Sequence, residues 1–562
     1  MDRVWLKHYP EGVPVDIDDA GPASLVAMCE EACSRFADRP AFGNFGTYLS
    51  FEELDAHSRA FAAYLQQRLG IARGDRVAIM MPNVLQYPVA LLGVLRAGGV
   101  VVNTNPQYTA RELLHQLRDS GARAIVVMRE MLPVLATVIA ETALEHVIET
   151  RVGDLLPWPR SILYDFVAAR RAKSAPRAAL PSAVHRFPDV LAAGRRLALD
   201  APALGPEDLA FLQYTGGTTG TSKGAMLSHG NVVANVRQVT AWFNGLTTPG
   251  SEIIVTALPL YHIYALSVNC FTFMWQGGLN YLVTNPRDLT GFVKDIARIP
   301  FTAITGVNTL FNHLAMHPGF RTLDFSHLRF TSGGGMAVQR PVAEAWQELT
   351  GSVIIEGYGL TEASPVVTIN LLASTGFTGL IGVPMPSTEC RVVDDEGRDV
   401  APGDSGELWV RGPQVMRGYW QRPEETAQVI TGDGWLKTGD IAVMSENGLF
   451  KIVDRKKDMI LVSGFNVYPN EIEEVVASHP GVLEVAAVGV PDRNTGEAVK
   501  VIIVRSDKSL TAESVIEHCR GMLTGYKIPR HVAFATELPK SNVGKILRRT
   551  VRDIYGDESP SG

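Results

Sequence analysis

The chain has 562 residues, of which 46% are hydrophobic and 20% are charged. A single core does not organise this length, so we expect two to four domains of an ordinary globular protein. The formal net charge of −7 gives no reason to expect a nucleic-acid partner. Five scattered cysteines are typical of a reducing compartment and argue against a disulfide framework.

The N-terminus has no apolar run long enough for a signal peptide. Residues 253–275 imitate a membrane span, but this run contains Pro259, His262 and Asn269, so we interpret it as buried core. We therefore expect a cytoplasmic protein that at most touches the inner face of a membrane as a peripheral protein.

Over the first 450 residues, apolar runs of strand length alternate with helical patterns. Residues 76–81, 87–96 and 99–103 are predicted as strand, helix and strand, and residues 122–128 as a further strand. This alternation predicts an α/β fold, with layered and largely parallel sheets.

Residues 160–200 are unusually basic, with eight Lys or Arg against three Asp. Beside Trp158, Tyr164 and Phe166, such a surface is suited to rest on anionic lipid. The alternative is a plain solvated insertion.

Eight consecutive residues, 215–222, are Gly, Thr or Ser, and Lys223 follows them. Such a loop exposes the backbone N–H groups and hydroxyls that a polyphosphate needs as donors. It is not a Walker A loop, because Ser222 precedes the lysine and strand-like runs flank the loop on both sides. We predict a phosphate-binding loop of another kind; a flexible surface hairpin is the alternative.

Four shorter motifs follow. Residues 258–264 place a histidine and two tyrosines in apolar sequence, where a lone histidine is usually a core residue. The glycines of residues 332–336 allow a flat ring to approach the backbone. Residues 356–362 offer an aromatic ring, a hydroxyl and a carboxylate, which suit a base, a phosphate oxygen and a hard cation. Residues 434–440 end in a carboxylate suited to ribose hydroxyls.

Residues 380–450 change to short strands separated by turns, which predicts a small β-rich subdomain. Residues 454–458, Asp-Arg-Lys-Lys-Asp, lie between two apolar runs. We interpret them as a hinge between a large domain, residues 1–453, and a small mobile α/β domain, residues 459–562; a solvated turn is the alternative.

Within the small domain, Asn470 is expected to cap a helix, with Glu473 in the capping-box position. Residues 482–490 and 499–504 are predicted as strands, and residues 512–522 as a helix.

In their order and spacing these motifs resemble the adenylate-forming superfamily, which comprises acyl-CoA synthetases, adenylation domains of peptide synthetases, and luciferases. The likeness covers nearly the full chain. The longer stretches 258–263, 304–311, 454–473 and 538–549 most resemble bacterial long-chain fatty-acid–CoA ligases.

The resemblance implies a two-step reaction with ATP and coenzyme A as co-substrates. A fatty-acid carboxylate attacks the α-phosphorus of ATP to give acyl-AMP and pyrophosphate, and the CoA thiolate then displaces AMP. Mg²⁺, held by Glu362 and Thr215, would screen the phosphates. Lys545 would bridge the carboxylate and the α-phosphate, with Thr361, Glu362 and His262 as further catalytic residues. The implied nucleotide-binding residues are Thr215, Gly216, Gly217, Thr218, Thr219, Gly220, Lys223, Gly334, Gly335, Glu356, Gly357, Tyr358, Gly359, Asp440 and Arg455.

The resemblance also implies that the small domain turns between the two steps, with Lys457 as its hinge residue. The turn would withdraw Lys545 and bring Ser463, Gly464 and Phe465 to the site as the path for CoA.

An alkyl chain needs an apolar tunnel, and several apolar residues near the motifs are suitable. The candidates are Tyr261, Tyr264, Leu266, Val307, Leu310 and Phe311, with Val366 beyond them. The alternatives are a ligase for medium-chain or aromatic acids, a ligase that loads a carrier protein, and, in a different class, a non-catalytic lipid-uptake protein. A homodimer is an open alternative to a monomer.

Overall fold

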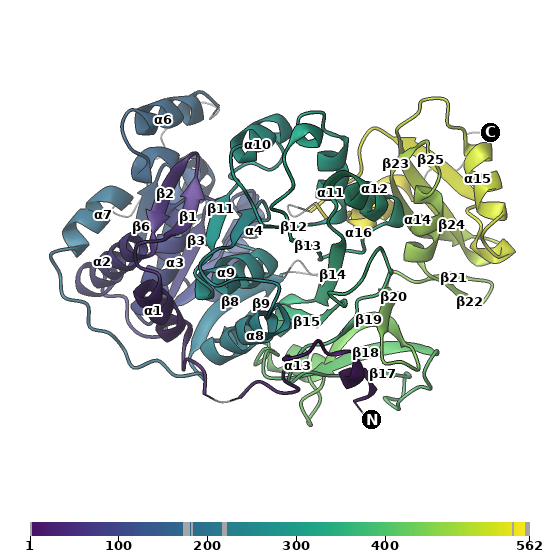
Figure 1. The fold of residues 1–562 in the computed structure, drawn as a ribbon, viewed down its shortest axis with the longest axis horizontal. Helices are drawn as coiled ribbons and strands as arrows, with labels where there is room; N and C mark the ends of the chain where they lie inside the picture. The colour runs from purple at the N-terminus through teal and green to yellow at the C-terminus, as the bar shows by residue number, and fades with distance from the viewer. Residues whose placement is uncertain are drawn as a thin grey trace.

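The computed structural model describes residues 3–18, 20–171, 180, 184–215, 222–541 and 544–556. Its first layer is a seven-stranded sheet of order β7-β6-β5-β3-β4-β8-β9 (Figure 1). All neighbouring strands are parallel except β8 and β9. The strands are β3 (Arg76–Met80), β4 (Val100–Asn103), β5 (Ala124–Met128), β6 (His146–Thr150), β7 (Val184–Arg186), β8 (Leu209–Thr215) and β9 (Lys223–Ser228).

Helices flank this sheet because parallel strands need crossover connections. They are α2 (Phe51–Leu69), α3 (Gln86–Arg96), α4 (Ala110–Ser120), α5 (Leu132–Ala136), α6 (Arg160–Arg171) and α7 (Phe187–Gly194). The helix α3 is buried along its whole length, and it supplies Tyr87 to the main hydrophobic core. The Tyr87 hydroxyl lies 2.7 Å from Asn103 Oδ1 and 2.8 Å from Leu260 O, so it links β4 to the loop that carries His262.

The second layer is a nine-stranded sheet of order β16-β15-β14-β13-β12-β10-β11-β1-β2. The six strands from β14 to β1 in this order are parallel, whereas β2, β15 and β16 pair antiparallel. The strands are β1 (Pro40–Asn44), β2 (Thr47–Ser50), β10 (Ile253–Thr256), β11 (Leu279–Leu282), β12 (Ala303–Gly306), β13 (Phe330–Gly333), β14 (Ile354–Gly359), β15 (Val366–Ile369) and β16 (Val383–Pro384). Its helices are α1 (Leu25–Arg35), α8 (His229–Trp242), α9 (Phe273–Trp275), α10 (Leu289–Ile296), α11 (Asn308–Met316) and α12 (Arg340–Thr350).

A four-stranded antiparallel sheet, here the β-subdomain, follows the second layer. It contains β17 (Glu389–Val393), β18 (Ser405–Arg411), β19 (Leu436–Met444) and β20 (Phe450–Arg455), with α13 (Pro423–Val429) inserted. A last five-stranded sheet, β22-β21-β24-β23 with β25 parallel to β24, forms the C-terminal lobe. Its elements are β21 (Ile460–Val462), β22 (Phe465–Val467), α14 (Pro469–Ala477), β23 (Val482–Asp492), β24 (Gly496–Arg505), α15 (Ala512–Arg520), β25 (His531–Ala535) and α16 (Arg548–Tyr555).

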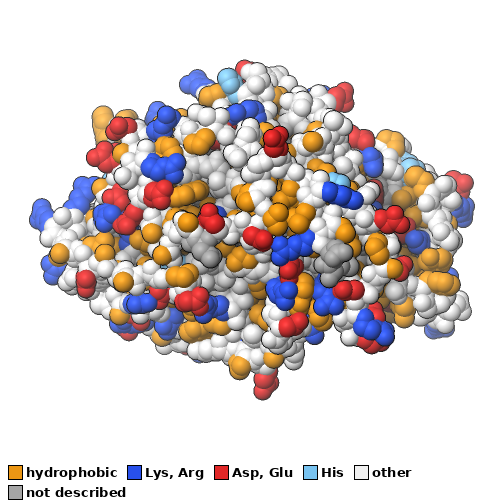
Figure 2. Space-filling view, turned by 60° about the horizontal axis from the view of Figure 1, so that its bottom comes forward, with side chains coloured by type: hydrophobic (Ala, Val, Ile, Leu, Met, Phe, Trp, Pro, Cys, Tyr) orange, Lys and Arg blue, Asp and Glu red, His pale blue; other side chains and the backbone are white. Residues whose placement is uncertain are grey.

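The predicted fold class is therefore confirmed: layered α/β sheets are followed by a β-rich sheet and a small α/β lobe. Residues 253–275 form β10, a π-helical segment (Ala265–Thr272) and α9 inside the large layers, as buried core. Within the described ranges, no helix combines the length and the apolarity needed to cross a bilayer. On the face drawn in Figure 2, acidic and basic side chains are interspersed.

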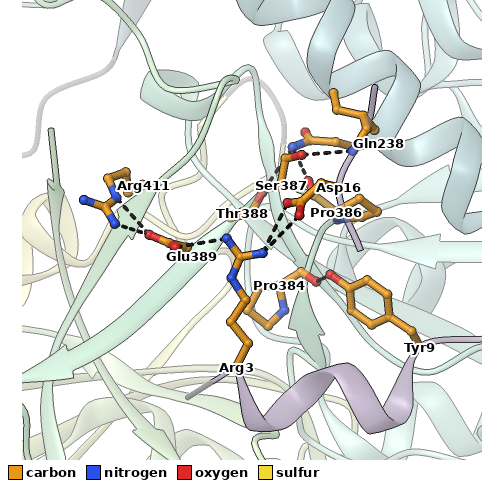
Figure 3. Close-up of polar contacts among 11 residues, drawn as sticks. Arg3, Tyr9, Asp16, Gln238, Pro384, Pro386, Ser387, Thr388, Glu389 and Arg411 are labelled. Carbon is orange, nitrogen blue, oxygen red and sulfur yellow. Dashed lines mark hydrogen bonds and ion pairs between the residues drawn. The ribbon is translucent and has the colours of Figure 1, made fainter. Parts of the chain in front are cut away.

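The N-terminal segment, residues 3–18, fastens the β-subdomain to the rest of the molecule (Figure 3). Arg3 donates to Glu389 Oε1 at 3.0 Å, and the Tyr9 hydroxyl donates to Pro384 O at 2.8 Å. Trp5 is buried against Phe450 of β20, with ring centroids 6.0 Å apart. This contact matters for the site because β19 and β20 carry Asp440 and Arg455.

The predicted cap of the helix near residue 470 is wrong. The helix α14 begins at Pro469, with Tyr468 before it, so Asn470 lies inside the first turn. A proline at the first helical position needs no N–H partner, and this favours the earlier start. The Asn470 N–H and the Glu473 carboxylate instead bind partners in the linker and in α16.

Candidate active site

The carboxyl ends of β12, β13 and β14 meet at one edge of the nine-stranded sheet. Gly306 pairs with Gly333, and Gly333 pairs with Glu356, so the loops after these strands lie beside one another. In open α/β sheets this edge is where ligands bind. The motifs 332–336 and 356–362, which are far apart in the sequence, are brought together here.

The glycines at this edge serve different purposes. A Cβ atom at Gly334 would lie 3.2 Å from the Tyr264 ring and 3.2 Å from Gly357 O. The Tyr264 hydroxyl is 3.0 Å from Ser332 Oγ, so the ring stands beside the glycine backbone. A Cβ atom at Gly359 would lie 2.0 Å from Pro365 O, so this glycine is explained by packing alone. Gly334 and Gly357 therefore pack closely at this edge, beside the Tyr264 ring.

A polar cavity lies near the point where β14 contacts the β-subdomain. Tyr358 donates to Asp440 Oδ2 at 2.6 Å, and Arg455 Nε lies 3.3 Å from Asp440 Oδ1. A cavity of about 250 Å³ is lined by Thr438, Gly439, Asp440, Arg455, Lys456 and Lys457. Its carboxylate and guanidinium are suited to vicinal hydroxyls, and the sequence analysis had selected both residues.

The buried carboxyl of Glu356 lies deeper at the same edge. Its Oε1 accepts from the Val338 N–H at 3.3 Å, and burial raises the pKa of Glu356 to about 8. Glu356 is thus mainly protonated at neutral pH, so it offers a hydrogen bond rather than a charge.

Glu362 follows β14 and faces the lysine of the glycine-rich segment across one tyrosine. The Tyr419 hydroxyl donates to Glu362 Oε1 at 2.8 Å, and Lys223 Nζ lies 5.1 Å from the centroid of the Tyr419 ring. Lys223 also pairs with Glu425. Thr361 opens the short turn that contains Glu362. The loop residues Gly216, Gly217, Thr218, Thr219 and Gly220 lie outside the described residues.

Sequence reasoning missed Tyr419 and Glu425. No motif marks them, because only the fold places the Tyr419 loop and α13, which carries Glu425, beside β9. Tyr419 bridges to Ala225, and the Trp420 N–H donates to Gly224 O at 2.8 Å.

Lys545 reaches the cleft from the C-terminal lobe. The Lys545 N–H donates to Ser541 Oγ at 3.1 Å, and the Thr309 hydroxyl of α11 donates to Gly544 O at 3.1 Å. Burial, with the positive charge of Arg455 next in importance, lowers the pKa of Lys545 to about 8, while Asp440 opposes this shift. Burial and the nearby charge of Lys545 lower the pKa of His262 to about 4, so the imidazole is neutral at physiological pH. Lys545 therefore lies within electrostatic reach of both the His262 loop and the Asp440 cavity.

The hairpin predicted as the CoA path is not at this cleft. Ser463 and Gly464 form its tip with positive φ angles of 52° and 83°. Phe465 is exposed and stacks on Tyr526 with centroids 4.7 Å apart. Figure 1 places β21 and β22 on the outer flank of the C-terminal lobe. Lys457, in contrast, faces Asp440 and Glu362, and burial lowers its pKa.

The predicted acyl-pocket residues divide among three cores. Leu266 and Val307 are buried in the core between the large sheets, whereas Phe311 packs on Trp346 with centroids 4.8 Å apart. Leu310 lies partly buried between the two cores. Tyr261 and Tyr264 are partly exposed beside His262, and Val366 belongs to a third core under the β-subdomain. Tyr261 and Tyr264 are thus the members nearest to the cleft surface.

Comparison with known proteins agrees with this geometry. Residues 29–420 match the family model for AMP-binding enzymes, and residues 471–545 match that for the C-terminal domain of AMP-binding enzymes. A long-chain-fatty-acid–CoA ligase of Escherichia coli O157:H7 is 58% identical over 553 residues, covering 98% of each chain. One of the same name from Haemophilus influenzae is 51% identical, again over 98% of each chain. The crystal structure of an anthranilate CoA ligase with anthranoyl-AMP has a TM-score of 0.84 at 25% identity, over 95% of this chain and 98% of that one. The chain therefore belongs to the family of AMP-binding enzymes.

Proposed function

We propose that the protein is a long-chain fatty-acid–CoA ligase that forms acyl-AMP from ATP and then acyl-CoA. The observation that carries this proposal is the approach of Lys545 to Asp440 and Arg455, which joins the C-terminal lobe to the nucleotide cavity. Relatives named for this activity are 51% and 58% identical to the chain over nearly its whole length.

In the first step, the carboxylate oxygen bonds to the α-phosphorus of ATP as the bond to the pyrophosphate oxygen breaks. Lys545 stabilises the negative charge that builds between carboxylate and phosphate, an effect of about 10²–10³ in rate for one donor. Gly334 and Gly357 border the adenine, Asp440 binds the ribose, and Lys223 leaves Glu425 for the departing pyrophosphate.

Mg²⁺ is a proposed cofactor of this step. Mg²⁺ is typically bound by one or two carboxylates, with waters and substrate phosphates as its other ligands. In the part of the chain that the structure describes, no cluster of three or more His, Cys, Asp or Glu side chains forms a metal cage. The lone carboxylate of Glu362, with Thr215 at the end of β8, fits that pattern. The bound ion would neutralise phosphate charge.

In the second step, the CoA thiolate attacks the acyl carbon and AMP leaves. The lobe would turn about Lys457, taking Lys545 away and bringing the hairpin of Ser463, Gly464 and Phe465 to the cleft. Gly464 has a φ of 83°, and no atom lies within 4 Å of the position that a Cβ would take there, so the backbone leaves room for a narrow thiol chain.

The substrate class is tested by measuring AMP release with CoA over straight-chain acids from six to eighteen carbons, together with ferulate and benzoate. We expect kcat/KM for the acid to rise with chain length, because each buried CH₂ contributes about 0.8 kcal/mol of binding free energy. A preference for the aromatic acids would favour the alternative that a feruloyl-CoA synthase, 34% identical over 91% of the chain, suggests. No AMP release with any acid would refute the ligase proposal.

A peripheral membrane contact is a further part of the proposal. Trp158, Ile162 and Leu163, in and before α6, are 78%, 62% and 60% exposed, and Arg160 lies among them. An apolar patch with basic neighbours suits an anionic bilayer. Flotation with phosphatidylglycerol vesicles at low salt tests the contact, and sedimentation of the free protein distinguishes a homodimer from a monomer.

A further inference from the structure

Arg548, three residues after Lys545, is held in an acidic niche beside the linker. Its side chain is 16% exposed and donates through Nε and Nη2 to the two oxygens of Glu473, at 2.9 and 2.7 Å. Nη1 donates to Asp454 Oδ1 at 2.7 Å, and Asp458 Oδ2 lies 3.8 Å away. One guanidinium thus engages three carboxylates.

These acidic partners belong to different parts of the molecule. Glu473 is in α14 of the same lobe, and it also accepts from the Ala487 N–H at 2.9 Å. Asp454 is the second-last residue of β20 in the β-subdomain, and its side chain is only 1% exposed. The Asn470 N–H donates to Asp454 Oδ2 at 2.7 Å, and Asn470 Nδ2 donates to Val453 O at 3.0 Å. Three hydrogen bonds therefore cross from the lobe to the end of β20.

These three bonds depend on how the lobe is turned, as does the bond from Thr309 to Gly544 O, whereas the Arg548–Glu473 pair within the lobe does not. If the lobe rotates about Lys457, Asp454 stays with β20 while Arg548 and Asn470 leave with the lobe. Arg548 then keeps Glu473, and Asp454 keeps the N–H of Arg455 at 2.7 Å. Arg548 thus keeps a charged partner and Asp454 keeps one backbone donor, so the rotation lowers the penalty of separating a buried ion pair.

We propose that Asp454 and Arg548 form a latch that closes only when Lys545 faces the nucleotide cleft. This inference rests on the proposed two-step function. Two residues separate Arg548 from Lys545, so the latch fixes the position of the segment that carries the ammonium group. Asp454 and Arg548 are positioning residues for acyl-AMP formation, and they take no part in thioester formation.

The test measures the two half-reactions separately in the full-length protein. Pyrophosphate release with ATP and palmitate, without CoA, reports the first, and thioester formation from supplied palmitoyl-AMP and CoA reports the second. Asp454→Asn and Arg548→Gln are each expected to slow the first by roughly 5- to 150-fold, the usual range of coupling between sites. The second should be unchanged or faster.

Further variants separate a latch from a merely structural ion pair. The double variant should be no slower than the slower single variant, because both remove the same contact. Arg548→Lys should restore part of the first half-reaction, since it keeps the charge and loses the two-pronged geometry. Glu473→Gln, which acts within the lobe, should lower the melting temperature and slow both half-reactions. Arg520→Gln, at an exposed arginine paired with Glu517 in α15, is the matched control and should change neither.

The orientation of the lobe can also be measured without catalysis, as a distance between two labels, so the test works even if the enzyme is inactive. All five cysteines are buried, so labels can be placed at the exposed Met316 and Met522 after substitution to cysteine. The label distance should show one main population in the parent protein and a second one in Asp454→Asn. Equal slowing of both half-reactions, or no change in either, overturns the latch, as does an unchanged distance distribution. An inactive parent with a shifted distribution would refute the proposed function and keep the latch.

Discussion

At the scale of single residues, the cleft changes the protonation of its ionisable groups in ways that bear on the chemistry. Burial holds Glu356 neutral and His262 uncharged near pH 7, and it brings the pKa of Lys545 to about 8. Because Glu356 is mainly protonated, it adds no negative charge of its own beside the carboxylates of Asp440 and Glu362.

The Lys545 shift predicts an alkaline limit for acyl-AMP formation. The pKa is lowered, so the ammonium form is present below about pH 8 and is lost as the pH rises through this value. Because kcat/KM reports the free enzyme, kcat/KM for ATP in the absence of CoA should fall above pH 8. A pH profile of pyrophosphate release measures this.

Lys545→Arg provides the control for that profile. Arginine stays charged throughout the range, so the variant should be slower but should lose the fall near pH 8. A fall at the same pH in this variant would assign the titration to another group.

At the scale of elements, the ends of β12, β13 and β14 form one edge of the proposed nucleotide site, because parallel strands bring their carboxyl ends together. The N-terminal segment then holds the β-subdomain in place through Arg3, Trp5 and Tyr9. The residues proposed to contact adenine and ribose thus come from two sheets, whose relation is set by packing rather than by any single motif.

Substitution of two glycines at this edge by alanine should have different effects, one on ATP binding and the other on stability. Gly334→Ala puts a methyl group 3.2 Å from the Tyr264 ring, so we expect KM for ATP to rise with little change in melting temperature. Gly359→Ala puts it 2.0 Å from Pro365 O, so we expect a loss of about 1–3 kcal/mol in unfolding free energy. Thermal melts and ATP titrations of both variants measure the difference. A comparable loss of stability in both would contradict the proposed position of Gly334 beside the adenine.

At the scale of the whole molecule, the C-terminal lobe is turned so that Lys545 faces the cleft while the hairpin of Phe465 faces outward (Figure 1). Under the proposed two-step mechanism, this arrangement would serve the first step, and the second step would need another orientation of the lobe. The linker residues 454–458 lie where such a turn would occur.

Lys545→Ala is predicted to split the two half-reactions. Acyl-AMP formation should fall by about 10²–10³, because one stabilising donor is lost in the transition state. Conversion of supplied acyl-AMP to the thioester should remain near the parent rate, since the lysine has then left the cleft. Lys508→Ala, at an exposed lysine of the same lobe, is the control. A parallel decline in both half-reactions would contradict the turning lobe.

The sequence by itself determined the layered α/β class and the order of the motifs, because hydrophobic period and short-range chemistry are local properties; Asp440, Arg455 and Lys545 were predicted as site residues through the resemblance to a known family. It placed the strands 76–81, 99–103 and 122–128 to within two residues of β3, β4 and β5. It assigned Glu473 a capping role that the early start of α14 excludes. Tyr419, Glu425, Arg548 and the orientation of the lobe were decided only by the tertiary structure, because their partners lie far away in the sequence and only packing brings them into contact.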